Sequence, residues 1–216
     1  GFPRPAFLST EDEHFDSFAA MYYEELEKLY GKAKYYSMDP FHEGGNTEGV
    51  DLAKAGTSIM SAMKKANPEA VWVMQAWQAN PREAMVSTLD SGDLLVLDLY
   101  SEKLPQWGDP ESMWYREKGF GKHDWLYCML LNFGGNVGLH GRMEQLVNGY
   151  YNACAHVNGK TLRGVGATPE GIENNPVMFE LLYELPWREE RFSPDEWLQA
   201  CSGSSSWTCQ VYQPDV

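Results

Sequence analysis

The chain has 216 residues, of which 43% are hydrophobic and 13% aromatic, enough to bury a sizeable core in one domain. Its formal net charge of -14 repels phosphate backbones and anionic lipid surfaces, and no block of lysine and arginine offsets it locally, so we expect no nucleic acid or membrane partner. No apolar run approaches the roughly 20 residues of a spanning helix, and residues 1–7 lack the pattern of a signal peptide, which predicts a soluble chain from which any export signal has been removed.

Apolar periodicity predicts helices and strands that alternate along the chain. The first helix is expected to open at Thr10, whose hydroxyl has the capping-box spacing to Glu13, and to run to Gly31 with Phe18, Met21 and Tyr22 on its apolar face. The expected strands that follow are residues 34–38, 70–77, 93–99, 124–131 and 162–166. The expected helices are residues 50–66, 81–89 with proline in the first turn, 142–157 and 177–185, and one that opens at Ser193.

Alternating strands and helices of this kind predict a parallel sheet wrapped by helices, either open and doubly wound or closed as an eight-stranded barrel. Neither a G-x-G-x-x-G after a first strand nor a P-loop is present, so the sequence lacks the usual motifs of an open sheet that binds nucleotides. The sequence therefore favours an α/β fold that is a partial (β/α)8 TIM-type barrel, with about five βα units and a helical C-terminal end.

The cysteines and histidines give no metal-binding pattern, because the four cysteines form no C-x-x-C pair and the five histidines show no ligand spacing. We therefore expect no metal site. Cys128 and Cys154 lie in apolar segments and are expected to be buried. Cys201 and Cys209 can pair if the compartment is oxidising, which the sequence leaves open.

Polar residues gather directly after each predicted strand, which is where a TIM-type barrel places its catalytic groups. Glu43 follows the first predicted strand and Glu170 the fifth, and each stands directly before a glycine. A glycosidase needs one carboxyl group to protonate the leaving oxygen and a second to meet the positive charge at the sugar carbon. Amides and carboxylates for the hydroxyl groups and tryptophan for the ring face also suit a pyranose.

Several of these residues have a purely structural alternative. Asp98 is as readily a buried carboxylate satisfied by backbone N–H groups or an arginine as a catalytic group. Trp72 and Trp77 point to opposite faces of their strand, so one is expected to pack in the core, and Trp77, nearer the strand end, is the better site candidate. His42 is as readily a packing residue as a hydrogen-bond donor to a substrate.

Five ordered stretches of the sequence resemble a known family. They are similar, in order, to the C-terminal half of the catalytic barrel of the α-N-acetylglucosaminidases, glycoside hydrolase family 89, whose members include a human lysosomal enzyme and many enzymes of gut bacteria. The resemblance covers about residues 7–198, so residues 1–198 are expected to be a portion of the glycosidase barrel and residues 199–216 a C-terminal tail. The stretches are residues 36–45, 71–77, 94–99, 128–136 and 166–172.

This resemblance implies a retaining hydrolysis of terminal α-linked N-acetylglucosamine from glycans, with Glu43 in the place of the general acid/base and Glu170 in that of the nucleophile. It implies no metal or organic cofactor and a location outside the cytoplasm, in the periplasm, a lysosome or the medium. The residues expected to shape the sugar pocket are His42, Trp77, Tyr127, Asn132 and Asn136.

Two alternatives stay open at this point. The family's barrel has strands before residue 34 that this sequence lacks, so the chain can be an inactive or sugar-binding fragment, or one piece of an assembly in which another chain completes the barrel. A third interpretation keeps the barrel and changes the specificity, for example to a β-linked hexosaminide.

Overall fold

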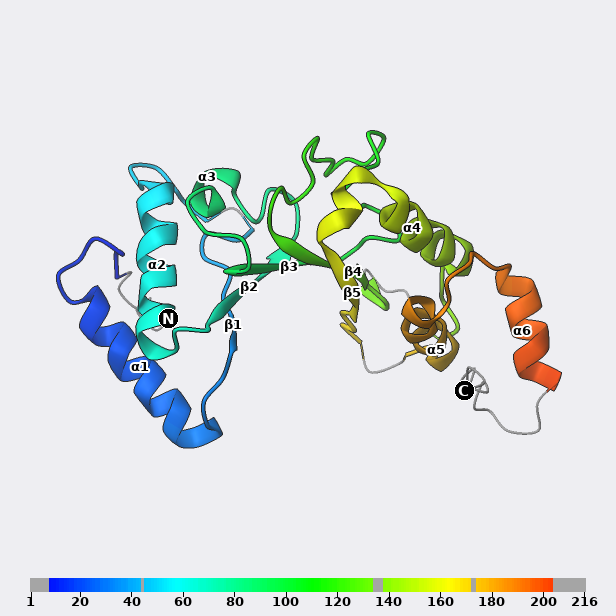
Figure 1. Ribbon diagram of the computed structural model, residues 1–216, viewed down its shortest axis with the longest axis horizontal. Coiled ribbons are helices and arrows are strands. Elements are labelled where there is room, and N and C mark those ends of the chain that lie inside the picture. Colours follow the sequence, from blue (N-terminus) through cyan, green and yellow to red (C-terminus); the bar gives the residue numbers. More distant parts are fainter. Residues whose placement is uncertain (1–7, 44, 134–137, 172–173, 204–216) are drawn as a thin grey trace, which may run out of the picture. The chain divides into compact units, whose positions relative to one another are not determined.

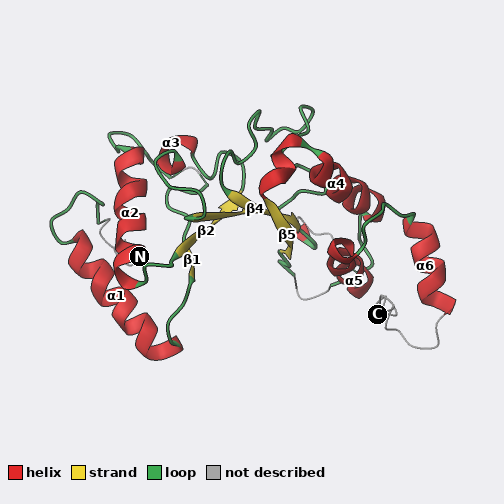
Figure 2. Ribbon diagram, in the orientation of Figure 1, coloured by secondary structure: helices red, strands yellow, loops and turns green. Residues whose placement is uncertain are grey.

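The computed structural model describes residues 8–43, 45–133, 138–171 and 174–203. The chain divides into two compact units, the first comprising Gly1–Leu97 with Phe120–Trp125 and the second Asp98–Gly119 with Leu126–Val216. Figure 1 labels the helices and strands, and Figure 2 colours them by type. Among the described residues, no helix has the length and apolar character needed to cross a membrane.

Helices and strands alternate along the chain. The elements up to the end of β3 are α1 (Phe15–Tyr30), β1 (Tyr35–Ser37), α2 (Leu52–Ala66), β2 (Val71–Ala76), α3 (Glu83–Val86) and β3 (Leu94–Asp98). Those that follow are β4 (Asp124–Met129), α4 (Met143–Ala155), η2 (Val157–Thr161), β5 (Leu162–Ala167), α5 (Pro176–Glu184), η3 (Leu185–Trp187) and α6 (Pro194–Gly203).

The strand order follows the chain, β1-β2-β3-β4-β5. β1 and β2 are parallel, with Tyr36 opposite Trp72 in the register. This order, with helices between the strands, is that of a βα barrel wall, as the sequence predicted. All five expected strands are present within two residues of their predicted bounds.

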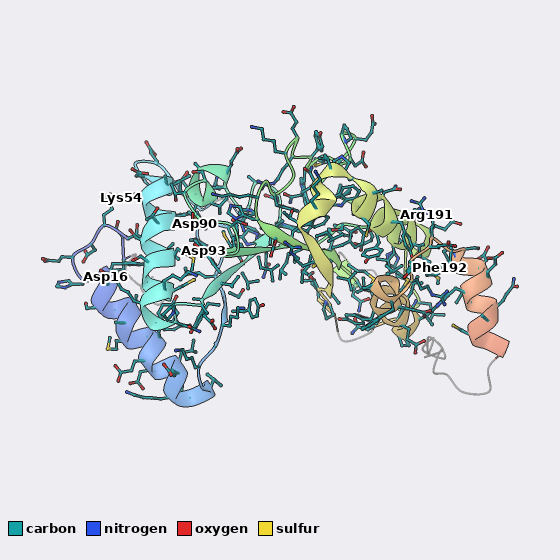
Figure 3. The ribbon with its side chains drawn as sticks, in the orientation of Figure 1. Asp16, Lys54, Asp90, Asp93, Arg191 and Phe192 are labelled. Carbon is teal, nitrogen blue, oxygen red and sulfur yellow. The ribbon has the colours of Figure 1, made fainter. Side chains whose placement is uncertain are left out.

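The first unit is built around α2. Asp51 caps this helix by accepting a hydrogen bond from the Lys54 N–H at 3.0 Å, and its buried side chains include Ile59 and Met63. α1 lies beside α2 (Figure 1) and is linked to it by the ion pair of Asp16 with Lys65 at 2.6 Å. Figure 3 labels Asp16 on α1 and Lys54 on α2. Both charges of the pair are exposed, so it adds little stability.

The predicted start of α1 is wrong. The helix begins at Phe15 and not at Thr10, because the preceding residues form turns in which the Asp12 carboxylate accepts the His14 N–H at 2.8 Å. α1 has no buried residue, and its apolar side chains Phe18 and Tyr22 are 55% and 61% exposed.

The helix predicted at residues 81–89 is also much shorter in the structure. Only Glu83–Val86 is helical, and Pro81 stands outside it, joined to Asn80 by a cis peptide bond. Trp77 and Asn80 form an isolated β-bridge, and Leu89 turns into the core with 3% exposure. The bridge at Asn80 and the burial of Leu89 therefore confine the helix to its four central residues.

In the second unit, α4, α5 and β4 supply the buried side chains, among them Tyr127, Leu146 and Leu181. α6 begins as predicted, with the Ser193 hydroxyl accepting the Glu196 N–H at 3.5 Å.

The free cysteines differ from one another. Cys128 is buried as expected, whereas Cys154 is exposed on α4, since its neighbour Ala153 takes the inward position. Cys201 is disulfide-bonded, but Cys209 lies outside the described residues, so their pairing stays a prediction.

Candidate active site

The loop after β1 in the first unit carries Glu43 and is conformationally strained. Phe41 and Glu43 have φ values of 59° and 48°, in the left-handed region that residues with a Cβ rarely adopt. Such positions concentrate at functional sites, because surrounding structure must hold them. Glycine is required at position 45, since a Cβ there would lie 2.5 Å from the Cα of Phe41. The Glu43 side chain is exposed.

Asp39 ties this loop to the end of β2. Its Oδ1 accepts hydrogen bonds from the Gln75 N–H at 2.8 Å and from the Asn80 Nδ2 at 2.9 Å. The same Asn80 Nδ2 donates to the carbonyl oxygen of Gln75 at 2.5 Å. Burial raises the pKa of Asp39, and these two hydrogen bonds act in the opposite direction.

Two predicted sugar-contacting residues, His42 and Trp77, lie in these segments. Trp77 is half-buried in the turn after β2 and Asn80 donates its N–H to the Trp77 carbonyl at 3.0 Å. The His42 Nε2 is buried and has no hydrogen-bond partner within the described residues. Trp72 is the core tryptophan: it is fully buried, and its Nε1 donates to the Met38 carbonyl at 2.8 Å. The interpretation that one tryptophan packs in the core is confirmed.

In the second unit, Glu170 and Asn132 lie in neighbouring loops. The Asn132 Nδ2 donates to the Asn174 Oδ1 at 3.0 Å, and the Asn174 Nδ2 donates to the Gly171 carbonyl at 3.0 Å. Asn132 has a φ of 63°, and a Cβ at Gly171 would lie 3.1 Å from the Asn132 Cβ. These contacts bring the loop after β4 against the loop that carries the exposed Glu170.

The remaining two residues predicted to contact the sugar are Tyr127 and Asn136. Tyr127 is fully buried, and its hydroxyl lies 3.4 Å from the Leu146 carbonyl and 3.5 Å from the Gln145 carbonyl, both in α4. It packs between β4 and α4 and offers no surface to a ligand, contrary to the sugar contact expected of it. Asn136 lies outside the described residues.

Sequence reasoning gave no role to a second buried carboxyl group beside Asp98. Asp98 is fully buried and its Oδ2 accepts the Gln106 N–H at 3.2 Å, as the structural alternative predicts, whereas its buried Oδ1 has no hydrogen-bond partner within the described residues. Glu102 accepts the Leu130 N–H at 3.1 Å and is 7% exposed. Burial raises the pKa of Asp98 to about 7, and burial together with the nearby Asp98 raises the pKa of Glu102 to about 8.

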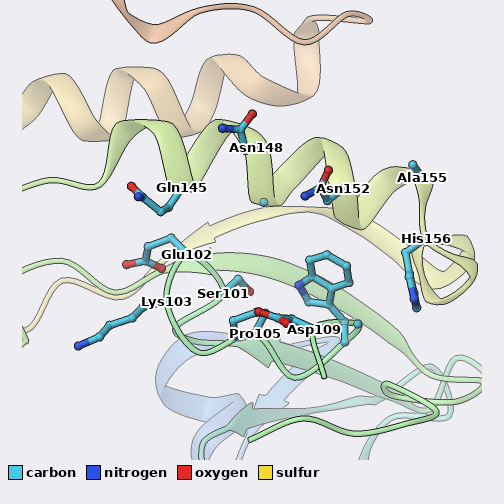
Figure 4. A pocket seen from close by; sticks show the side chains of 13 residues that line it. Ser101, Glu102, Lys103, Pro105, Asp109, Gln145, Asn148, Asn152, Ala155 and His156 are labelled. Carbon is cyan, nitrogen blue, oxygen red and sulfur yellow. The ribbon is translucent and has the colours of Figure 1, made fainter. Parts of the chain in front are cut away.

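A cavity of about 650 Å³ lies in the second unit between the loop after β3 and α4 (Figure 4). None of the predicted catalytic residues lines it. Two of its amide side chains are already engaged, since Arg191 donates to the Oδ1 atoms of Asn148 at 3.3 Å and Asn152 at 2.6 Å. Its other lining residues are Ser101, Glu102, Lys103, Pro105, Trp107, Gly108, Asp109, Gln145, Gly149, Ala155 and His156. Within the described ranges, no group of three or more His, Cys, Asp or Glu residues is placed to hold a metal ion.

The fold defines a class, the α/β-barrel proteins, and comparison with known proteins narrows it to the glycoside hydrolases. Residues 1–189 match the family model described as the alpha-N-acetylglucosaminidase (NAGLU) tim-barrel domain. The chain belongs to this family, so the resemblance and the fold class predicted from the sequence are confirmed.

The relatives agree with this assignment. Human alpha-N-acetylglucosaminidase is 36% identical over 194 residues, which are 85% of this chain and 25% of the human protein. A family 89 glycoside hydrolase from Clostridium perfringens, solved in complex with PUGNAc, superposes with a TM-score of 0.76 at 32% identity. A variant of that enzyme with two glutamate-to-glutamine substitutions, in complex with its substrate GlcNAc-alpha-1,4-galactose, gives the same values.

The match covers only part of the relatives. The chain spans a quarter of the human protein, and 90% of the chain covers 21% of the clostridial one.

Proposed function

We propose that this chain carries the catalytic carboxyl groups of a retaining α-N-acetylglucosaminidase, with Glu43 as general acid/base and Glu170 as nucleophile. The observation that carries the proposal is the match to the family along residues 1–189, within which both glutamates stand in loops directly after strands. Two further observations support it: the left-handed backbone at Glu43, and a relative that was solved with its substrate after two glutamates had been changed to glutamine.

In the first step, the carboxylate of Glu170 attacks the anomeric carbon while the carboxyl group of Glu43 gives its proton to the departing glycosidic oxygen. The C–O bond to the aglycone breaks, and an ester forms between the sugar and Glu170. In the second step, Glu43, now ionised, takes a proton from water as the water oxygen attacks the same carbon and Glu170 leaves. Two inversions give overall retention.

We infer three accompanying properties from family membership. The substrate is a glycan that ends in α-linked N-acetylglucosamine, and His42, Trp77 and Asn132 contribute to the sugar pocket. The reaction uses no metal or organic cofactor. The protein acts outside the cytoplasm.

The roles are tested in a complete barrel that carries this sequence. Glu170→Gln is expected to lower kcat about 10³-fold or more on every aryl α-N-acetylglucosaminide, because the ester intermediate cannot form. Glu43→Gln is expected to lower the rate much more on an alkyl glycoside than on a dinitrophenyl glycoside, since only the poor leaving group needs the proton. Glu48→Gln, an exposed glutamate of the same loop, is the matched control. Near-normal turnover by Glu170→Gln would reject the nucleophile assignment.

The second candidate is a fragment, or a chain completed by another, that binds N-acetylglucosamine without hydrolysing it. The observation that favours it is the small share of each relative that the chain covers. It predicts weak sugar binding and no turnover by the 216-residue chain, and turnover by that chain would exclude it. If the aryl β-N-acetylglucosaminide is cleaved and the α-linked one is not, a β-linked specificity replaces the α-linked one.

A further inference from the structure

We propose that Asp39 is a positioning residue that holds the loop bearing Glu43 against the end of β2 and so sets where the acid/base carboxyl group stands. The inference rests on the proposed function, since it gives Glu43 that role. The observation behind it is geometric: a single carboxylate oxygen of Asp39 accepts two hydrogen bonds from the end of β2 and the turn after it.

The loop needs such a support. Left-handed backbone at a residue with a Cβ costs of the order of 1 to 3 kcal/mol and persists only where the surroundings hold it, and this loop has two such residues, Phe41 and Glu43. On the N-terminal side of Asp39, the Met38 N–H donates to the Val73 carbonyl at 3.2 Å and the Met38 carbonyl accepts the Trp72 Nε1 at 2.8 Å. Asp39 is the next anchor along the chain and the last before the strained residues.

The same anchor reaches the predicted sugar-contacting tryptophan. Asn80 donates its Nδ2 to Asp39 and its backbone N–H to the Trp77 carbonyl at 3.0 Å. Asn80 is 4% exposed, and its Oδ1 has no hydrogen-bond partner among the described residues. The turn that holds Trp77 is therefore linked to Asp39 through Asn80. Removal of the Asp39 carboxylate would leave the Gln75 N–H without this acceptor, and the Asn80 Nδ2 would keep only its hydrogen bond to the Gln75 carbonyl.

Moving the Asp39 carboxylate from water to this half-buried position costs free energy of desolvation. Its two charge-assisted hydrogen bonds offset this cost and are directional, which is what a positioning role requires. Positive charge on His42, in the same loop, lowers the pKa of Asp39. The carboxylate accepts hydrogen bonds from two neutral donors, the Gln75 N–H and the Asn80 Nδ2.

The test compares Asp39→Ala, Asp39→Asn and Asp51→Ala in the complete enzyme. Asp51 is a matched control, because it is an aspartate of the same connection whose carboxylate also accepts a backbone N–H, but at the start of α2. We expect Asp39→Ala to lower kcat/KM about 100-fold, the cost of a displacement of about 1 Å in a catalytic group. Asp39→Asn keeps the Oδ1 acceptor and is expected to stay within a few-fold of the parent.

Asp51→Ala is expected to lower Tm by about 2 °C and to leave kcat/KM within about two-fold of the parent. Asp39→Ala with kcat/KM within two-fold of the parent would overturn the proposal. A loss in Asp39→Asn as large as in Asp39→Ala would also overturn it, because the charge and not the position would then matter.

A second measurement is independent of catalysis. In Asp39→Ala, the Gln75 amide loses its acceptor, so we expect its hydrogen exchange to be at least about ten-fold faster than in the parent, with no such change in Asp51→Ala. An unchanged Gln75 exchange rate would reject the anchoring role even if the enzyme proved inactive. Inactivity of the parent with the exchange result intact would instead reject the proposed function alone.

Discussion

Gly149 allows the hydroxyl of Tyr127 to approach the backbone of α4. A Cβ at this position would lie 2.3 Å from the Tyr127 Oη, a distance that real Cβ atoms do not show, and 3.2 Å from its Cζ. Gly149→Ala is therefore expected to lower the free energy of unfolding by about 1 kcal/mol or more, although alanine is the better helix former. Urea unfolding followed by circular dichroism measures the change.

The tyrosine hydroxyl gives the matched control. In a Tyr127→Phe background the atom nearest the new methyl group is gone, so Gly149→Ala should cost less there than in the parent. Equal costs in the two backgrounds would show that the crowding at Tyr127 does not explain the need for glycine.

Glu102 and Asp98 make the stability of the second unit pH-dependent. Burial holds the proton on Glu102 up to about pH 8 in the folded chain, whereas an unfolded chain releases it near 4.5. Between these values the folded state binds more protons than the unfolded state, so the free energy of unfolding falls as pH rises from 5 to 8. Asp98, with a pKa raised to about 7, acts in the same direction, and Arg142 opposes the effect at Glu102.

Glu102→Gln removes one of these protons and keeps an acceptor for the Leu130 N–H. We expect the loss of Tm between pH 5 and pH 8 to become smaller in this variant. The exposed Glu189→Gln is the control and should keep the slope of the parent. The same slope in Glu102→Gln as in the parent would contradict the assignment.

Residues whose role depends on local pattern could be predicted from the sequence, and those that act over long sequence separations could not. The core position of one tryptophan and the backbone partner of Asp98 followed from strand alternation and burial. Glu102 and Leu130 are 28 positions apart, and Asp39 and Asn80 are 41 apart, so no spacing rule indicates that they meet. Tyr127 lies inside the apolar strand β4, between Leu126 and Cys128, and the packing of α4 against it shows that it is buried.

At the level of elements, the strands were predicted better than the helix ends. A buried strand is a continuous apolar run that packing preserves, so β2, β3 and β4 lie where the pattern placed them. The first residues of α1 and α3 depend on competing local structure. Asp12 stabilises a turn, so α1 begins later in the chain than predicted, and the Trp77–Asn80 bridge precedes α3, which also begins later. None of the apolar side chains of α1 is buried.

The two helices of the first unit are expected to differ in local stability. α2 has six buried residues and a carboxylate cap, whereas α1 has no buried residue and no side-chain cap. Since protection from exchange follows burial, the amides of α1 should exchange faster than those of α2 in native-state hydrogen exchange. Equal protection in the two helices would show that α1 is held by contacts other than those with α2.

At the scale of the whole molecule, the sequence sufficed to predict a partial α/β barrel of the family 89 glycoside hydrolases. It could do so because five stretches of the sequence, each of which includes a strand or its end, resemble the family in the same order. The division of the chain into two units was not predicted, since its boundary falls inside β3 and β4, where no linker composition marks it. We propose residue 198 as the end of the barrel portion, although α6 runs on to Gly203.

The central claim is that Glu170 forms a covalent bond to the sugar in a retaining reaction. The most direct measurement is to incubate a complete barrel that carries this sequence with a fluorinated N-acetylglucosamine analogue that is transferred to the enzyme quickly and released slowly. The protein is then digested, and the labelled peptide is identified by mass spectrometry. We predict one sugar per chain, on the peptide that contains Glu170, and none in Glu170→Gln. Label on another carboxylate, or release of inverted product with no label at all, would contradict the account.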